Sequence, residues 1–119
     1  MKTTDIARRL VDYCKKADWN GAHEELYSKD AVSIEPDATP DFEKETRGLS
    51  AIRAKGKKFD SMVEKLHKIT VSEPLVAGNS IAFALEMDVT MKDRGRMDFP
   101  ELCVYQVKDG KIVSEQFFM

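Results

Sequence analysis

The sequence has 119 residues, of which 42% are hydrophobic, and this is enough for one domain with one core but leaves no room for a second. The 19 Lys and Arg residues against 21 Asp and Glu give a net charge of -2, which argues against a nucleic-acid-binding groove because such grooves need a basic excess on one face. No apolar run approaches the roughly 20 residues that span a bilayer, and no secretory signal is present, so we expect a cytoplasmic protein with a single domain over residues 1–119.

The first part of the chain shows helical periodicity. Apolar residues at helical spacing predict an amphipathic helix over residues 4–17, with Thr3 or Thr4 helping to cap its first turn. Asp18 or Asn20 begins a second, shorter helix. Both helices are amphipathic enough to lie on a sheet.

The middle of the chain contains a short predicted strand, a loop and a third helix. Residues 31–34 predict a short strand, halted by a proline. Residues 36–48 are mostly polar and predict a loop of the length that often acts as a lid. A third helix begins near Ser50 and extends to Leu66. Gly56 within it costs about 1 kcal/mol relative to Ala and indicates close packing or a bend.

The third helix contains a basic cluster and ends near a histidine. Because Asp60 and Glu64 interrupt the cluster, we interpret it as a solvated helix face. His67 stands at the predicted helix end, where its cationic form suits the dipole, and we favour this over a catalytic role. The cluster consists of Arg53, Lys55, Lys57, Lys58 and Lys65.

After His67 the pattern changes from helical periodicity to alternation, which predicts a sheet. Residues 69–77 form a strand region bent near Pro74, and Gly78-Asn79 is the next turn. A long strand with one buried face then follows. The residues of that face are Ile81, Phe83, Leu85, Met87 and Val89.

The last two predicted strands, around residues 97–107 and 111–119, are joined at Asp109-Gly110, which supplies the positive φ angles of a tight hairpin. The last strand should lie inside the sheet, because exposing Phe117 and Phe118 would forfeit roughly 2 kcal/mol each. The element order predicts an α+β fold with helices on one face of a curved sheet, and the gap between them is a natural ligand pocket.

The sequence lacks the motifs of metal, nucleotide and serine-hydrolase chemistry. Cys14 and Cys103 have no metal-ligand or redox spacing, so we interpret them as reduced, buried thiols. His23-Glu24-Glu25 has Tyr27 where the second histidine of a zinc-protease helix would stand. We expect no metal and no cofactor.

Three segments resemble a known family in their order and spacing. They are Leu26–Pro36, Arg47–Ile52 and Val104–Val113. Over nearly its whole length the chain resembles the SnoaL-like branch of the NTF2-like superfamily. The resemblance implies a cone, in which a strongly curved antiparallel sheet wraps around three N-terminal helices and usually forms a homodimer through its outer face. It implies no single chemistry, because the fold hosts isomerases, cyclases, dehydratases, hydrolases and binding modules.

Glu35 is the first candidate catalytic residue. Glu35-Pro36 resembles the pair in ketosteroid isomerases of this superfamily, whose catalytic carboxylate directly precedes a proline. A carboxylate half-buried in an apolar pocket has a raised pKa and can shuttle a proton beside a carbonyl. The alternative is a solvated glutamate at a strand end. Val11 and Cys103 stand where those isomerases have oxyanion donors, so we do not expect steroid isomerisation.

Glu101 and Tyr105 are the second candidates, provided that their side of the strand faces the pocket. Their face also holds Met97, Phe99, Cys103 and Val107, whereas the opposite face holds Leu102 and Val104. If the opposite face lines the pocket instead, Glu101 is a surface or dimer residue. Six apolar residues either line the pocket for a small apolar organic ligand or fill the core: Trp19, Phe59, Met62, Phe83, Met87 and Phe118.

Three functions remain open from the sequence. The first is a cofactor-free acid–base enzyme of the isomerase, cyclase or dehydratase type, with Glu35 as the base. The second is a non-catalytic protein that binds an apolar ligand. The third is a dimeric interaction module whose cone is filled with side chains, the outer face offering Ala82, Ala84, Leu102 and Val104.

Overall fold

The computed structural model describes residues 1–119 as three helices and a seven-stranded sheet. The helices are α1 (Thr3–Lys15), α2 (Trp19–Leu26) and α3 (Leu49–Met62). The strands are β1 (Tyr27–Ile34), β2 (Glu45–Arg47), β3 (Val63–Val71), β4 (Leu75–Ala77), β5 (Ser80–Met91), β6 (Gly95–Lys108) and β7 (Lys111–Phe118). None of the helices combines the length and hydrophobicity that crossing a membrane requires.

The sheet has the order β2-β1-β7-β6-β5-β3, and β4 pairs with β5. All neighbours are antiparallel except β1 and β7, which are parallel. The α+β prediction is therefore confirmed, with the refinement that the sheet is mixed. A parallel pair needs a long crossover, and the whole chain between β1 and β7 supplies it.

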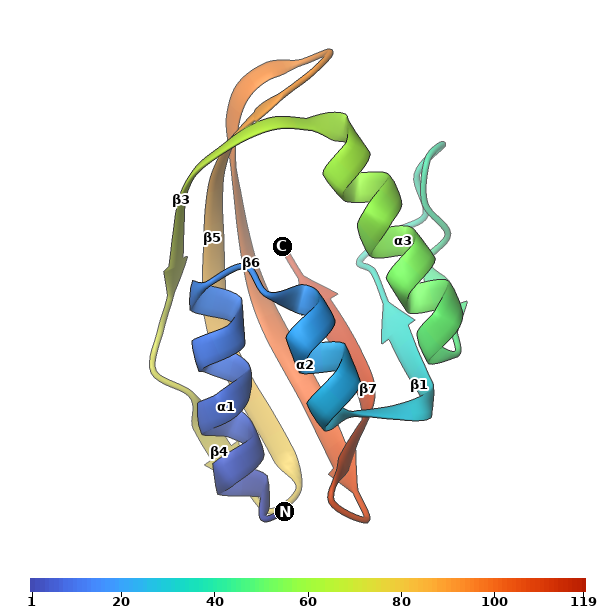
Figure 1. Cartoon of the computed structure of the whole chain (residues 1–119), viewed down its shortest axis with the longest axis vertical. Helices are drawn as coiled ribbons and strands as arrows, with labels where there is room; N and C mark the ends of the chain where they lie inside the picture. Colours follow the sequence, from blue (N-terminus) through green and yellow to red (C-terminus); the bar gives the residue numbers. More distant parts are fainter.

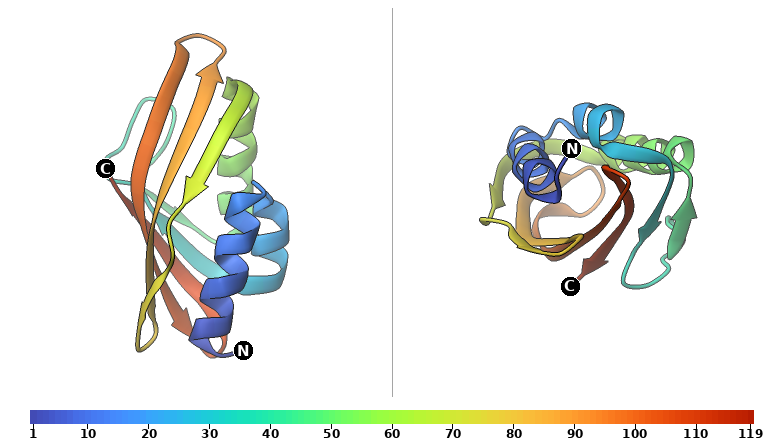
Figure 2. Two further views of the ribbon diagram at one scale, coloured as in Figure 1. Left: turned by 90° about the vertical axis from the view of Figure 1, so that its left-hand side faces the viewer. Right: turned by 90° about the horizontal axis from the view of Figure 1, so that it is seen from below.

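The sheet curves around the helices, as the cone predicts. α1 and α2 lie side by side against its concave face, and α3 lies farther along, beside β1 (Figure 1). The end-on view shows the strands curling around the helices (Figure 2). The core between them includes Ile6 and Leu10 from α1, Ile81 and Phe83 from β5, and Ile112 from β7.

The terminal hairpin has the turn that its sequence predicts. Asp109 and Gly110 have φ angles of 52° and 76°. β7 lies between β1 and β6, inside the sheet. Phe117 packs against the core. Phe118, the next residue, points to the outer face and is 46% exposed.

Several predicted boundaries were wrong. The residue before α1 is Lys2, and no side chain caps that helix, whereas Asp18 caps α2 by accepting a hydrogen bond from the Gly21 backbone N–H. β1 begins at Tyr27 rather than residue 31, because the buried Tyr27 already pairs with β7. Loop residues 36–48 contain the short strand β2.

The third helix is shorter than predicted. α3 ends at Met62, and the following residues pair with β5, so His67 lies in β3 and not at a helix end. The His67 ring nitrogen Nε2 lies 2.6 Å from the Thr90 hydroxyl on that neighbouring strand. The expected close packing at Gly56 was also wrong, because a Cβ there would meet no atom within 4 Å.

Candidate functional site

A row of polar side chains crosses the concave face of the sheet. Ser33 of β1 pairs with Glu115 of β7, and Glu115 pairs with Tyr105 of β6. Paired residues on neighbouring strands point to the same side, and all three are buried. The face of β6 that contains Glu101 and Tyr105 is therefore the inward one, as one of the two sequence interpretations predicted.

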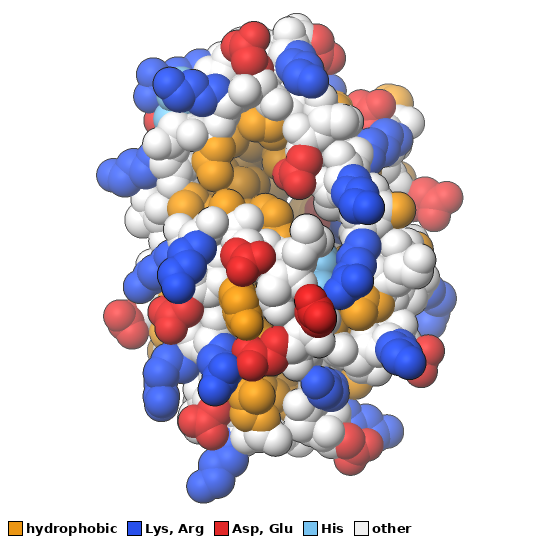
Figure 3. Space-filling model, in the orientation of Figure 1, with side chains coloured by type: hydrophobic (Ala, Val, Ile, Leu, Met, Phe, Trp, Pro, Cys, Tyr) orange, Lys and Arg blue, Asp and Glu red, His pale blue; other side chains and the backbone are white.

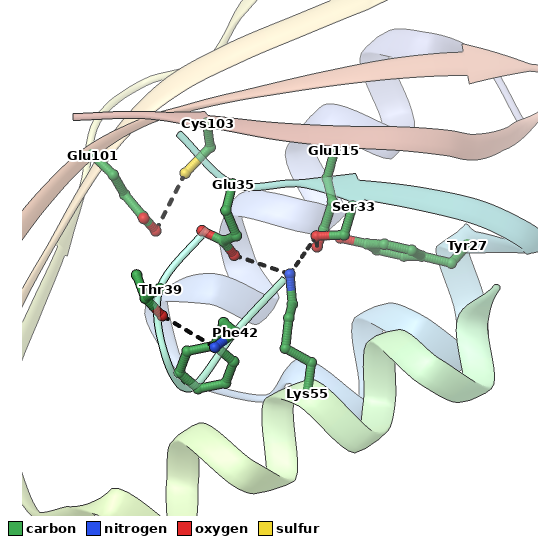
Figure 4. Close-up of polar contacts among 9 residues, drawn as sticks. All are labelled: Tyr27, Ser33, Glu35, Thr39, Phe42, Lys55, Glu101, Cys103 and Glu115. Atoms are coloured by element: carbon green, nitrogen blue, oxygen red, sulfur yellow. Dashed lines mark hydrogen bonds and ion pairs between the residues drawn. The ribbon is translucent and has the colours of Figure 1, made fainter. Parts of the chain in front are cut away.

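Lys55 joins this row from α3. Its Nζ atom donates to Glu35 Oε1 at 2.9 Å and to Ser33 Oγ at 2.6 Å (Figure 4). The Lys55 and Glu35 side chains are only 16% and 25% exposed. The interpretation of Lys55 as part of a solvated face was wrong, because its helical position follows Ile52 by three residues and precedes Phe59 by four.

Glu115 is the buried carboxylate at the other end of the row. It accepts hydrogen bonds from the Tyr27 hydroxyl and, at 2.7 Å, from Ser33 Oγ. Burial raises the pKa of Glu115, and the hydrogen bonds from Tyr27 and Ser33 oppose that rise. A continuous hydrogen-bonded chain thus leads from Tyr27 through Glu115, Ser33 and Lys55 to Glu35.

Glu101 lies beside this chain, one strand farther across the sheet. Its carboxylate and that of Glu35 face the same space next to α3, and the Cys103 thiol is 3.8 Å from Glu101 Oε1 (Figure 4). Burial, followed by the negative charge of Glu35, raises the pKa of Glu101 from 4.5 to about 7. At neutral pH this carboxyl group is therefore close to half protonated, which allows it to accept or donate a proton.

The molecular surface is hollowed between α3 and the sheet, and hydrophobic side chains line the hollow (Figure 3). Phe59 of α3 and Phe99 of β6 meet edge to face between this helix and the sheet, with ring centroids 6.0 Å apart. Met62 of α3 and Met87 of β5 are half-buried.

The other three residues of this set pack in or against the core or lie on the outer face. Phe83 is buried and stacks on the Tyr105 ring with centroids 5.4 Å apart, so both belong to the core beneath the site. Trp19 packs against the core from the start of α2. Phe118 does not line the hollow, because alternation along β7 places Phe117 inside and Phe118 outside.

The loop after β1 contacts α3. Its tip is a turn in which the Phe42 backbone N–H donates to the Thr39 hydroxyl at 3.0 Å. The Lys58 ammonium group lies 5.1 Å from the Phe42 ring centroid and donates to the Asp41 carbonyl. Two side chains of the basic cluster, Lys55 and Lys58, thus make specific contacts.

Sequence reasoning missed Tyr27, Ser33, Lys55 and Glu115 as site residues. Two of these had a usable signal. Ser33 and Glu35 are two residues apart in the strand pattern and so point to the same side of the sheet. Lys55 falls on the apolar stripe of α3.

No three His, Cys, Asp or Glu side chains are grouped in a way that could hold a metal ion.

The outer face of the sheet has a separate shallow groove of about 510 Å³. Its apolar lining includes Leu102, which is 45% exposed, together with Phe118, Pro100 and Ala84.

Cys14 and Cys103 are free and buried, as predicted.

Comparison with known proteins places this geometry in a family. A family model described as SnoaL-like domain matches residues 1–119. A structure from Mesorhizobium loti, described as a putative SnoaL-like polyketide cyclase (carbohydrate phosphatase), is 31% identical, covers 100% of both chains and superposes with a TM-score of 0.91. No curated protein matches significantly.

Two more distant structures share the fold. A protein of unknown function with a cystatin-like fold from Xanthomonas campestris is 20% identical over 99% of this chain and 90% of its own, with a TM-score of 0.83. TerC, crystallised with polyporic acid, is 12% identical over 98% of this chain and 90% of its own, with a TM-score of 0.77.

Proposed function

The chain belongs to the SnoaL-like domain family, and on that premise we propose that it binds a small, largely apolar organic molecule in the hollow and transfers a proton on it without a cofactor. The reaction type is that of an isomerase, cyclase or dehydratase. One observation supports this most directly: Glu101, with a pKa raised to about 7, faces the same space as the Lys55–Glu35 pair.

Glu101 and Glu35 divide the acid–base work in this proposal. Glu101 is available in both protonation states near neutral pH, so it gives or takes the proton. Glu35, held by Lys55, is the second carboxylate and can act as the base that the sequence suggested. Tyr105 lies deeper, stacked on Phe83, and supports the inner row instead of touching substrate.

Lys55 supplies the positive charge that this chemistry needs. Proton abstraction beside a carbonyl places negative charge on the oxygen, which must be stabilised. Val11 is buried in the core, and Cys103 is a buried thiol whose pKa is raised by burial, so neither residue stabilises an anion. The Lys55 ammonium group is paired with Glu35 at 2.9 Å, its charge also acts on Glu101, and in this proposal it fills that role.

The hollow suggests the chemical class of the ligand. Hydrophobic side chains line it (Figure 3), and the Lys55–Glu35 pair supplies charged groups on the same side of the sheet. A compact molecule with an apolar body and one carbonyl or enol group fits this arrangement. The fold relative TerC was crystallised with an organic acid, which supports this class of ligand.

Exchange of carbonyl-adjacent protons tests the proposal without knowledge of the substrate. Small cyclic ketones and 1,3-diketones are incubated with the protein in D₂O, and the loss of their α-proton NMR signals is followed. We expect catalysed exchange that Glu101→Gln reduces at least about tenfold. Glu73→Gln, at an exposed loop position, is the matched control.

Binding without catalysis is the alternative function. If the ketones shift the NMR signals of hollow residues but wild-type protein exchanges no protons, the chain is a ligand-binding module.

We also propose a homodimer through the groove on the outer face, because Leu102 and Phe118 leave apolar surface exposed there. The free, buried cysteines support a location in the cytoplasm.

A further inference from the structure

A second groove, of about 560 Å³, is lined by residues of α3 and by one residue of β1. Three cationic side chains line it, Lys29 from β1 and Arg53 and Lys57 from α3, together with Leu49, Ser50 and Ala54. No carboxylate lines it, although the chain as a whole has a net charge of -2. The groove is therefore a local concentration of positive charge.

The helical geometry separates this groove from the proposed active site. Arg53 and Lys57 are four residues apart and occupy one side of α3. Lys55 lies about 200° around the helix from Arg53 and points to the sheet instead. The basic cluster of the sequence thus divides between a site inside the fold and a groove outside it, and Figure 3 shows Lys and Arg side chains gathered over α3.

The cations of the groove have no partner within the protein. The chain's ion pairs all involve other residues. The Arg53 Nε atom is buried and has no hydrogen-bond acceptor. Because that atom is shielded from solvent, an anion in the groove would instead meet the part of the Arg53 side chain that lines it, together with Lys29 and Lys57.

We propose that this groove binds the oxyanion of a small phosphorylated molecule. Arg53 offers planar donors suited to phosphate oxygens, and Lys29 and Lys57 add charge from opposite sides. The Ser50 hydroxyl supplies a further donor, and Leu49 with Ala54 accommodates an apolar part of the ligand. This inference is independent of the acid–base chemistry, because none of these residues contacts Glu35 or Glu101.

A titration with pyrophosphate tests the groove. ¹⁵N–¹H NMR spectra are recorded at constant ionic strength, and we expect saturable shifts confined to residues 49–57 and the neighbourhood of Lys29. Arg53→Gln and Lys57→Gln should each weaken binding about tenfold. Lys65→Gln, which removes the same charge at an exposed position in β3, should leave the affinity unchanged, and so should Glu101→Gln.

Three results would overturn the proposal. Chemical shifts that do not saturate, or that change at every exposed lysine, would mean that pyrophosphate only screens the charges of the protein. An equal loss of pyrophosphate affinity in Lys65→Gln would mean that the overall positive charge of the surface, and not this groove, attracts the anion. An oligonucleotide that binds more tightly than pyrophosphate at equal phosphate concentration means a polynucleotide ligand. A dispersed spectrum for Arg53→Gln confirms that this variant folds, so that its loss of binding is informative.

Discussion

Lys55 of α3 donates a 2.9 Å hydrogen bond to Glu35 at the end of β1, and the same ammonium group donates to Ser33 two residues earlier. One helix side chain therefore holds together the end of a strand and the buried carboxylate chain behind it. The charge of Lys55 also lowers the pKa values of Glu101 and Glu115, opposing the effect of burial on both. The electrostatic balance of the whole site depends on this residue.

Replacing Lys55 by Met should destabilise the fold in a pH-dependent way. At pH 8 the carboxylates lose their cation, and we expect a loss of about 1–3 kcal/mol in the free energy of unfolding, between the values of surface and buried pairs. At pH 5 the loss should be smaller, because Glu101, with its pKa of about 7, is then protonated and needs no cation. Urea denaturation at both pH values measures this. Lys57→Met, on the exposed side of α3, should change little; a Lys55→Met protein as stable as wild type at pH 8 would contradict the pair.

Replacing Glu101 by Gln should stabilise the protein at alkaline pH. The folded-state pKa of about 7 is above the ordinary 4.5, so the folded protein holds this proton more tightly than the unfolded chain. This proton contributes about 3 kcal/mol to the free energy of unfolding. The contribution is fully present below pH 4.5 and is lost as the pH rises to 7. Relative to wild type, Glu101→Gln should therefore gain stability between pH 4.5 and 7 and keep it above.

The carboxyl pKa of Glu101 can also be measured directly. Carbon-13 NMR of side-chain carboxyls should show one glutamate that titrates near pH 7. In Glu35→Gln this midpoint should fall, because the negative charge of Glu35 is among the causes of the shift. A midpoint near 4.5 in the wild-type protein would remove the main support for proton transfer by Glu101.

His23 should make the fold sensitive to acid. Burial, with the charges of Arg53 and Lys55, lowers its pKa from 6.5 to about 4, so the folded protein holds it neutral. Its contribution to stability is present above pH 6.5 and is lost as the pH falls toward 4. His23→Phe keeps a ring against Tyr27, whose centroid lies 4.8 Å away, and should flatten this acid dependence. Denaturation curves of wild type and His23→Phe at pH 7 and pH 4.5 give the loss of unfolding free energy on acidification. An equal loss in the two proteins would refute the role of His23.

The outer sheet face should form a twofold dimer. Wild-type protein is expected to sediment as a dimer at micromolar concentration, and Leu102→Arg as a monomer with an unchanged circular-dichroism spectrum. Leu75→Arg is the matched control, because Leu75 is 76% exposed on β4 and does not line the outer groove. A monomeric mass for the wild-type protein would contradict the dimer prediction.

The sequence predicted the sheet best where alternation is unbroken. Along β5, Ile81, Phe83, Leu85 and Val89 are buried, as the pattern indicates. The α3 boundary failed for the opposite reason. The helical spacing of apolar residues continues past Met62, so only pairing of Val63 with Met91 in the folded sheet ends the helix.

Glu115 could not be found by alternation because the pattern slips. Ile112 pairs with Val107 and Ser114 with Gln106, which leaves Val113 as an extra residue in the strand. Counting in twos from the buried Ile112 would place residues 114 and 116 inside, whereas the irregularity turns Glu115 inward instead. A shift of one residue exchanges the two faces of a strand, and no local signal in the sequence announces it.

The parallel pairing of β1 with β7 has a consequence for how the site forms. Ser33 and Glu115 are 82 residues apart in sequence, and their hydrogen bond exists only after β7 docks between β1 and β6. Contacts of such long range form late, because the intervening chain must first be ordered. The proposed site and the closed sheet should therefore form together at the last step of folding, and a partly folded chain that lacks β7 would have neither.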